Sequence, residues 1–224
     1  MKPLSLLALT FLCLTGLAQA ADAPTAGSAT YKQGVQYQVV LPAQPVSTKP
    51  GQIEVIDFFW YGCPHCNAFE PYLENWERTK PANVVLVRVP AVLEPDWEAG
   101  ARAYYVAQAL GILSKSHKAT FDEIHQNKDV LQTEQDFERF YVKAFGVDPK
   151  KFESLWSSPD TDAKIQQSEV LAERYGLGIF GVPTIVVNGK WLTGGDLVNN
   201  ASQIMNVANY LIAQEEAALP AAAK

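Results

Sequence analysis

Cysteine, basic side chains and long apolar segments are all scarce in this sequence. Three cysteines stand among 224 residues, and 18 lysines and arginines face 24 aspartates and glutamates. Such an acidic chain lacks the positive field that nucleic-acid binding requires. The longest apolar run, within residues 4–17, is shorter than the ~20 residues that span a bilayer. These shortages exclude a nucleic-acid-binding protein and a stable membrane insertion.

The amino terminus has the pattern of a secretory signal peptide. Lys2 precedes the apolar run, and the small residues of Ala18-Gln19-Ala20 follow it. We therefore expect cleavage after Ala20, which removes one lysine and changes the net charge from −6 to −7. Cys13 leaves with the signal. The residue before it is Leu12, whereas a lipoprotein cleavage site has a small residue there, so we expect no lipid anchor.

The remaining composition indicates one folded α/β domain. Hydrophobic residues make up 48% of the chain, which is too many for a disordered protein. Runs of β-branched and aromatic residues alternate with helical patterns in the order β, β, α, β, a helical block, α, β, β, α. Because no low-complexity linker bounds the helical block, we interpret it as an insertion into a single domain.

Two cysteines remain after cleavage, and they stand together in Cys63-Pro64-His65-Cys66. A disulfide that closes so small a loop contributes only about 2 kcal/mol by chain entropy, and a chain of this size does not need it. We infer that the pair serves chemistry. An apolar strand, Ile53–Trp60, precedes it; Gly62 ends that strand, and Pro64 suits the first turn of a helix.

A cysteine at the start of a helix has a direct chemical consequence. The unpaired N–H groups and positive partial charge of the helix N-terminus favour a thiolate, so we expect Cys63 to be exposed with a lowered pKa. Cys66, one turn further, is expected to be more buried and to act as the resolving thiol. His65 can help to stabilise the Cys63 thiolate. A stabilised thiolate favours the reduced form and makes the protein a stronger oxidant.

The segment Asp57-Phe58-Phe59-Trp60-Tyr61-Gly62-Cys63-Pro64-His65-Cys66 resembles the active-site strand and helix of thioredoxin-fold oxidoreductases. Pro-His between the cysteines is typical of the DsbA family. The resemblance extends over about residues 31–216 and includes Gly181-Val182-Pro183-Thr184. It implies an α/β thioredoxin fold with an inserted all-helical subdomain.

On this basis we divide the chain into six segments. They are a signal peptide (1–20), a mobile leader (21–30), an N-terminal thioredoxin-like portion (31–93), the helical insertion (94–162), a C-terminal thioredoxin-like portion (163–216) and a flexible tail (217–224).

The resemblance also implies roles for residues away from the cysteines. In the family, the proline that matches Pro183 is cis and faces the disulfide, which implies that Val182 offers its backbone to an extended substrate chain. Asp57 matches a buried acid that is thought to relay a proton for the resolving cysteine, although many relatives carry Glu there. Glu70 matches another acidic position, and a solvated helix face is an equal alternative for it.

The function implied is oxidative folding of exported proteins in the periplasm. Cys63, Cys66, His65, Pro64 and Asp57 form the implied catalytic set. The implied partners are reduced, unfolded exported proteins and a quinone-linked inner-membrane oxidase of the DsbB type. The resemblance implies a monomer that needs neither a metal nor an organic cofactor.

Several alternatives compete with this interpretation. The same fold and chemistry occur in disulfide isomerases and reductases, and a thioredoxin-like chaperone or binding module is a rival of a different class. The cysteine pair could be half of a zinc site, but His117 and His125 are separated by seven residues, more than the usual three to five. We expect both histidines on a helix surface. Asp57 could instead face solvent at a strand edge, and Pro183 could begin a strand in trans.

Overall fold

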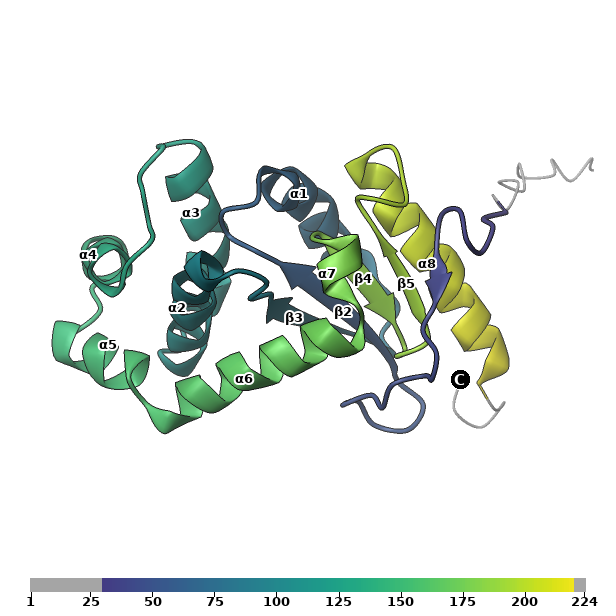
Figure 1. Ribbon diagram of the computed structural model, residues 1–224, viewed down its shortest axis with the longest axis horizontal. Helices are drawn as coiled ribbons and strands as arrows, with labels where there is room; N and C mark the ends of the chain where they lie inside the picture. Colours follow the sequence, from purple (N-terminus) through teal and green to yellow (C-terminus); the bar gives the residue numbers. More distant parts are fainter. Residues whose placement is uncertain (1–29, 220–224) are drawn as a thin grey trace, which may run out of the picture.

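A five-stranded mixed sheet organises the computed structural model, which describes residues 30–219 (Figure 1). Its strand order is β1-β5-β4-β2-β3. The strands are β1 (Gln38–Val39), β2 (Ile53–Phe59), β3 (Val84–Pro90), β4 (Thr184–Val187) and β5 (Trp191–Gly194). Strand β2 is parallel to β3 and antiparallel to β4. The predicted signal peptide and almost all of the predicted leader lie outside the described residues.

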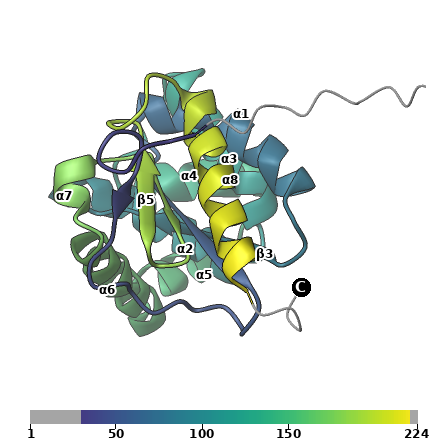
Figure 2. The same ribbon diagram turned by 90° about the vertical axis from the view of Figure 1, so that its right-hand side faces the viewer.

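Strand β2 is central because both of its faces are apolar. All seven of its residues are buried, and alternate side chains point to opposite faces of a sheet. Ile53 and Val55 pack with α1 (Pro64–Thr79) and α8 (Ala201–Ala218). Ile56 and Phe58 pack on the other side, with the end of α6 (Pro159–Arg174) and with α7 (Leu177–Phe180). Figure 2 shows α8 lying along the sheet beside β5.

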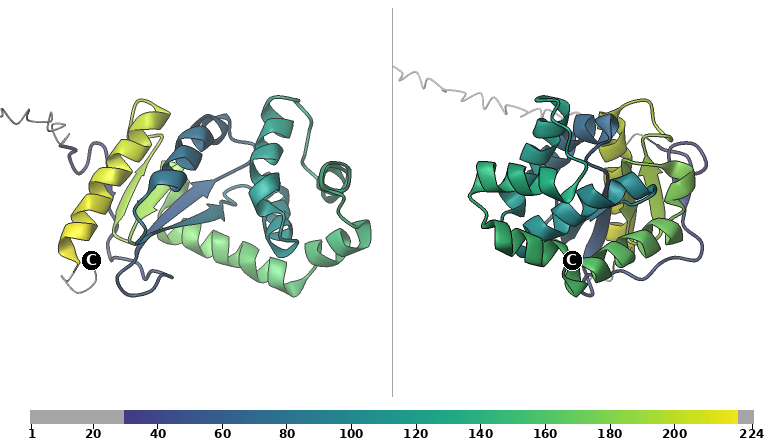
Figure 3. Two further views of the ribbon diagram at one scale, coloured as in Figure 1. Left: turned by 180° about the vertical axis from the view of Figure 1, so that it is seen from behind. Right: turned by 60° about the vertical axis from the view of Figure 1, so that its left-hand side comes forward.

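The helices between β3 and α6 form a second packed unit at the end of the molecule opposite α8 (Figure 1). They are the short 3₁₀ helix η1 (Pro95–Trp97), α2 (Glu98–Ala109), α3 (Leu113–His125), α4 (Glu134–Phe145) and α5 (Pro149–Trp156). Their own core contains Ala103, Val106, Phe137, Tyr141 and Phe152. The long helix α6 runs from this unit back to the sheet (Figure 3).

Local sequence signals place several helix starts in this unit correctly. Thr133 and Asp136 form a reciprocal capping box at the start of α4. Asp148 caps α5 by accepting a hydrogen bond from the Lys151 N–H, and Pro149 occupies the first turn. These contacts satisfy backbone groups that the first turn of a helix leaves without partners.

Other boundaries differ from the predicted ones. Helix α6 begins at Pro159, because Ser158 caps it, so the proposed end of the insertion at residue 162 falls inside α6. Residues 217 and 218 of the predicted tail belong to α8, which ends at Ala218; residues 220–224 lie outside the described range. Between residues 30 and 219, no helix is both long and apolar enough to cross a membrane.

Candidate active site

Cys63 is the N-cap residue of α1, as the sequence predicts. Its backbone is extended (φ −81°, ψ 116°), Pro64 occupies the first turn, and its Sγ accepts a hydrogen bond from the Cys66 N–H at 3.4 Å. The two cysteines are free thiols in the structure. A sulfur in this position faces the N–H groups that a new helix leaves unpaired.

This position lowers the pKa of Cys63 to about 6. The hydrogen bond from the Cys66 side chain contributes most; burial opposes the shift, and the backbone N–H groups of Cys66 and His65 and the charge of His65 add to it. The lowered pKa confirms the prediction, but the expected exposure is wrong: only 7% of Cys63 is accessible. The residue packs in an apolar cluster with Phe59 and Tyr61. Its neighbours Pro64 and His65 are exposed.

Cys66 is more buried and its pKa shifts in the opposite direction. Burial raises it well above the ordinary value of a thiol, and the Cys63 side chain and the charge of Asp57 raise it further. The two sulfurs, one helical turn apart, therefore differ in their preferred protonation state: Cys63 favours the thiolate and Cys66 favours the thiol.

The Val182–Pro183 peptide bond is cis, and it lies against the cysteines as predicted. The Cys63 thiol donates to the Val182 carbonyl at 3.6 Å. The backbone opposite this bond is tight: a Cβ at Gly194 would lie 2.7 Å from the Pro183 oxygen, so this position requires glycine. A second cis bond, Leu41–Pro42, was not predicted.

A hollow of about 280 Å³ opens beside the cis proline. Its lining includes His65, Ala68, Val182, Pro183, Asp196 and Ile204. Because the motif between the cysteines and the cis-proline loop form adjacent walls, a chain bound here lies within reach of Cys63.

Asp57 is buried in the middle of β2, on the face that packs against α1. It is 1% exposed, and its Oδ1 atom has no hydrogen-bond partner among the described residues. The pKa of Asp57 is raised to about 8, mainly by burial and also by the charge of Glu70, against the lowering effect of the Arg88 charge. The strand-edge alternative is therefore wrong, because β3 and β4 flank β2 on both sides.

Glu70 is also buried. The alternative that it lies on a solvated helix face is therefore wrong. Arg88 contacts its carboxylate at 3.2 Å and His117 Nε2 lies 3.4 Å from the same oxygen. Burial raises the pKa of Glu70, but the hydrogen bond and charge of His117, together with Arg88, outweigh that effect and hold the pKa below its ordinary value.

His117 is 7% exposed, so the predicted surface position is wrong for this residue. Helix α3 packs against α1 and places His117 edge-on to the ring of Phe59 at 4.9 Å. His125, on the same helix, is half-buried and contacts the Tyr61 carbonyl at 2.8 Å.

The predictions missed Tyr61, Arg88 and both histidines as members of this site. One signal pointed to Arg88: it is the one charged residue within the otherwise apolar strand β3, and it stands opposite Asp57 in the parallel register. The histidines had no such signal, because their partners come from distant segments. Between residues 30 and 219, no three histidine, cysteine or acidic side chains gather as a metal site requires.

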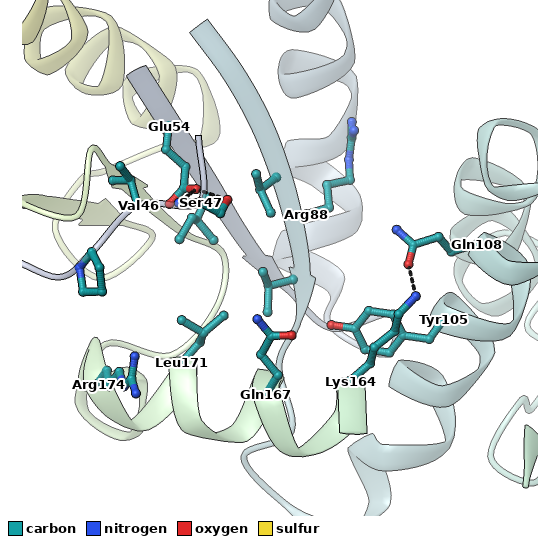
Figure 4. Close-up of a pocket in the computed structure, with 14 residues that line it drawn as sticks. Val46, Ser47, Glu54, Arg88, Tyr105, Gln108, Lys164, Gln167, Leu171 and Arg174 are labelled. Carbon is teal, nitrogen blue, oxygen red and sulfur yellow. Dashed lines mark hydrogen bonds between the residues drawn. The ribbon is translucent and has the colours of Figure 1, made fainter. Parts of the chain in front are cut away.

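A larger hollow, of about 390 Å³, lies on the side of the sheet that α6 covers (Figure 4). Ser47 and Glu54 line one end of it and Lys164, which donates to Gln108 at 2.7 Å, lines the other. No residue of the Cys63–Cys66 motif lines this hollow.

Comparison with known proteins agrees with this geometry. Residues 54–206 match the family described as DSBA-like thioredoxin domain. The chain is 38% identical to the thiol:disulfide interchange protein DsbA of Burkholderia cepacia over 213 residues, 95% of this chain and 96% of that protein. It is 36% identical to the DsbA of Pseudomonas aeruginosa over 210 residues, 94% of each.

Solved structures show the same similarity in three dimensions. The crystal structure of Pseudomonas aeruginosa DsbA superposes with a TM-score of 0.77 at 35% identity, covering 84% of this chain and 96% of that one. The Xylella fastidiosa DsbA superposes with a TM-score of 0.76 at 30% identity, covering 84% and 98%. Fold, dithiol motif and relatives together define a thiol:disulfide oxidoreductase with a thioredoxin fold and an inserted helical unit. The chain belongs to the DsbA-like thioredoxin family.

Proposed function

We propose that this oxidoreductase acts as an oxidase, giving its Cys63–Cys66 disulfide to reduced, newly exported proteins. The observation that carries the proposal is the opposite shift of the two thiol pKa values, downward to about 6 for Cys63 and upward for Cys66. A low pKa makes Cys63 a good leaving thiolate and stabilises the reduced form, so the protein disulfide is easily given away.

The reaction proceeds by two thiol–disulfide exchanges. A client thiolate attacks the Cys63 sulfur, the Cys63–Cys66 bond breaks, and Cys66 leaves with the electron pair and takes up a proton. The client's second thiolate then attacks the client sulfur of the mixed disulfide, and Cys63 leaves as the stabilised thiolate. Two electrons have passed from the client to the cysteine pair.

Asp57 is proposed to supply the proton that Cys66 needs. With its pKa raised to about 8, the carboxyl is mostly protonated at neutral pH. Its charge acts on Cys66, which places it within electrostatic reach of the departing sulfur. A buried acid that holds a proton at neutral pH is suited to general acid catalysis.

Val182 and Pro183 are proposed to orient the client chain. The contact of the Cys63 thiol with the Val182 carbonyl places this backbone next to the reacting sulfur. The hollow beside Pro183 is available for client residues that flank the reactive cysteine. Pro64 and His65, exposed between the cysteines, complete the surface that a client meets.

The proposed setting is the periplasm, and the proposed second partner is a quinone-linked membrane oxidase of the DsbB type that restores the disulfide. The signal-peptide pattern of residues 1–20 and membership of the family support both. We propose a monomer, with thioredoxin-like portions at residues 31–93 and 163–216 around the insertion at 94–162.

Equilibration of the Cys63–Cys66 pair with glutathione tests the oxidase proposal. Tryptophan fluorescence is a suitable readout, because Trp60 lies close to the pair. An equilibrium at the oxidising end of the known range, with fast oxidation of a dithiol peptide, is the expected result. An equilibrium like that of thioredoxin contradicts the proposal and indicates a reductase.

A further inference from the structure

Two histidines of the helical insertion contact opposite ends of Tyr61. The Tyr61 hydroxyl lies 2.9 Å from His117 Nδ1, and the Tyr61 carbonyl lies 2.8 Å from His125 Nε2. Tyr61 stands two residues before Cys63 in the sequence. The two histidines therefore hold the connection between β2 and the reactive cysteine through both the side chain and the backbone of Tyr61.

Helix α3 presents both histidines on one face. They are eight positions apart, a little over two turns at 3.6 residues per turn. Phe121, halfway between them, packs edge-on to the Tyr61 ring at 5.0 Å. Only 1% of Tyr61 is exposed, so water cannot replace these partners without a rearrangement of the cluster.

Both contacts with Tyr61 are complementary. A carbonyl only accepts hydrogen bonds, so His125 donates from Nε2 to Tyr61. The Tyr61 hydroxyl is both a donor and an acceptor, so its contact with His117 Nδ1 is satisfied whichever of the two atoms carries the shared proton. On the other side of the His117 ring, Nε2 lies 3.4 Å from the Glu70 carboxylate.

The segment that these contacts hold has little freedom of its own. The Cys63 N–H donates to the Trp60 carbonyl at 3.0 Å, which closes a turn over Tyr61 and Gly62. A Cβ at Gly62 would lie 2.3 Å from the Trp60 indole, so the chain passes close to that ring. The Cys63 sulfur must reach the Cys66 N–H at the end of this turn, and a shift of the turn lengthens that contact.

We infer that His117 and His125 are positioning residues for the dithiol centre: by holding the hydroxyl and carbonyl of Tyr61, they aim the Cys63 sulfur at the start of α1. They act through Tyr61 and do not touch the sulfur. The inference rests on the thiol:disulfide chemistry proposed above. It gives the helical insertion a role in setting the redox equilibrium.

The outer contact is tested with a pair of variants at one position. His125→Leu removes the donor, whereas His125→Gln keeps an N–H donor at a similar reach. In the leucine variant we expect a raised Cys63 pKa, followed by the ultraviolet absorbance of the thiolate, and a shift of the glutathione equilibrium of about fivefold toward the protein disulfide, the size of a weakened helix-terminus interaction. The glutamine variant is expected to stay close to the wild type.

The inner contact is tested by Tyr61→Phe, which removes only the hydroxyl. Tyr141→Phe is the matched control. The buried Tyr141 hydroxyl contacts α3 at Thr120 and also the Ala103 carbonyl, both at 3.4 Å. It makes no hydrogen bond to the turn before Cys63. We expect Tyr61→Phe to shift the glutathione equilibrium in the same direction as His125→Leu, by a smaller factor, and Tyr141→Phe to leave it unchanged.

Three results overturn the inference: a His125→Leu variant with the wild-type thiol pKa and glutathione equilibrium, equal shifts in His125→Leu and His125→Gln, or equal shifts in the two tyrosine variants. If His125→Leu does not fold, the tyrosine pair decides alone. Failure of the oxidase proposal is distinguishable, because it shows in the wild-type equilibrium, whereas the inference concerns only the differences between variants.

Discussion

The first turn of α1 and the protein interior behind it shift the pKa values of two cysteine thiols, Cys63 and Cys66, in opposite directions. At the helix start, hydrogen bonds lower the pKa of Cys63 to about 6. One turn further, burial raises the pKa of Cys66. The first effect comes mainly from groups within the Cys63–Cys66 motif itself, and the second from the strands and helices packed around it.

This difference in pKa gives the two sulfurs of one disulfide different roles in the exchange reaction. In the proposed mechanism the client attacks Cys63, the less buried of the two sulfurs, and Cys66 leaves. The mixed disulfide then resolves readily, because Cys63 leaves as the thiolate with the lower pKa. Cys66 is proposed to take up a proton from Asp57 as it leaves. In this proposal the interior serves Cys66, whereas the helix terminus serves Cys63.

The largest test of the comparison replaces the two cysteines separately. Cys63→Ala removes the attacked sulfur and is expected to lower the rate of client oxidation by about a thousandfold or more. Cys66→Ala keeps Cys63 but cannot resolve a mixed disulfide. Its Cys63 thiolate is expected to attack disulfide-bonded clients, releasing one client thiolate, and to accumulate as mixed disulfides visible on non-reducing gels. Biological activity that survives in Cys63→Ala would indicate a binding module in place of an oxidase.

Asp57→Ala tests the interior alone. We expect formation of mixed disulfides to slow by about a hundredfold, the scale of general acid catalysis, because Asp57 is proposed to protonate Cys66 as it leaves in that step. Their release by the client's second thiolate, which expels Cys63, is expected to change little. Stopped-flow fluorescence separates the two steps. Glu54→Ala is the matched control: Glu54 is a buried acid on the opposite face of β2 that accepts from the Ser47 N–H at 2.7 Å. Wild-type rates for both steps in Asp57→Ala would make Asp57 structural only.

The same carboxyl makes a prediction about stability and pH. The folded-state pKa of Asp57, about 8, lies above its ordinary value of 3.8, so the folded protein binds the proton more tightly than the unfolded chain. The contribution of Asp57 protonation to the free energy of unfolding is therefore fully present below about pH 4 and is lost as the pH rises through about 8. Relative to the wild type, Asp57→Asn should gain stability in urea as the pH increases from 4 to 8. A difference that does not vary with pH contradicts the raised pKa.

The helix terminus makes the opposite prediction for the reduced protein. The Cys63 pKa, about 6 against an ordinary 9.0, is depressed on folding, so its stabilisation is present above the ordinary value and is lost as the pH falls through about 6. Near pH 7 the oxidised protein is expected to unfold at lower urea than the reduced protein, and the gap should close below pH 6. Equal midpoints at pH 7 would contradict the stabilised thiolate.

The smallest expected effect belongs to His65. Its charge is the weakest of the named influences on the Cys63 pKa, and its side chain is exposed, so solvent screens it. His65→Ala is expected to raise the Cys63 pKa slightly, less than the loss of the His125 donor does. Titration in low and high salt checks the assignment, because added salt should shrink the difference between His65→Ala and the wild type.

Much of the site was predictable because its signals are local. Gly62 and Pro64 mark the change from strand to helix, and a helix that begins there has unpaired N–H groups whatever surrounds it. The segment Gly181-Val182-Pro183-Thr184 was also recognised in the sequence. Its cis bond was predicted from the family resemblance and not from the residues alone. The exposure of Cys63 was misjudged, because its cover comes from Tyr61 and Phe59, which the local pattern does not place.

The sequence by itself determined the dithiol motif, the helix that starts at it and the apolar strand that positions Asp57, since these depend on neighbours along the chain. Only the tertiary structure decided that Glu70 and His117 meet in the interior and that α3 holds Tyr61. Those contacts join segments about fifty residues apart, and a buried polar side chain is tolerated only where packing brings it a partner. No local pattern records which partner that is.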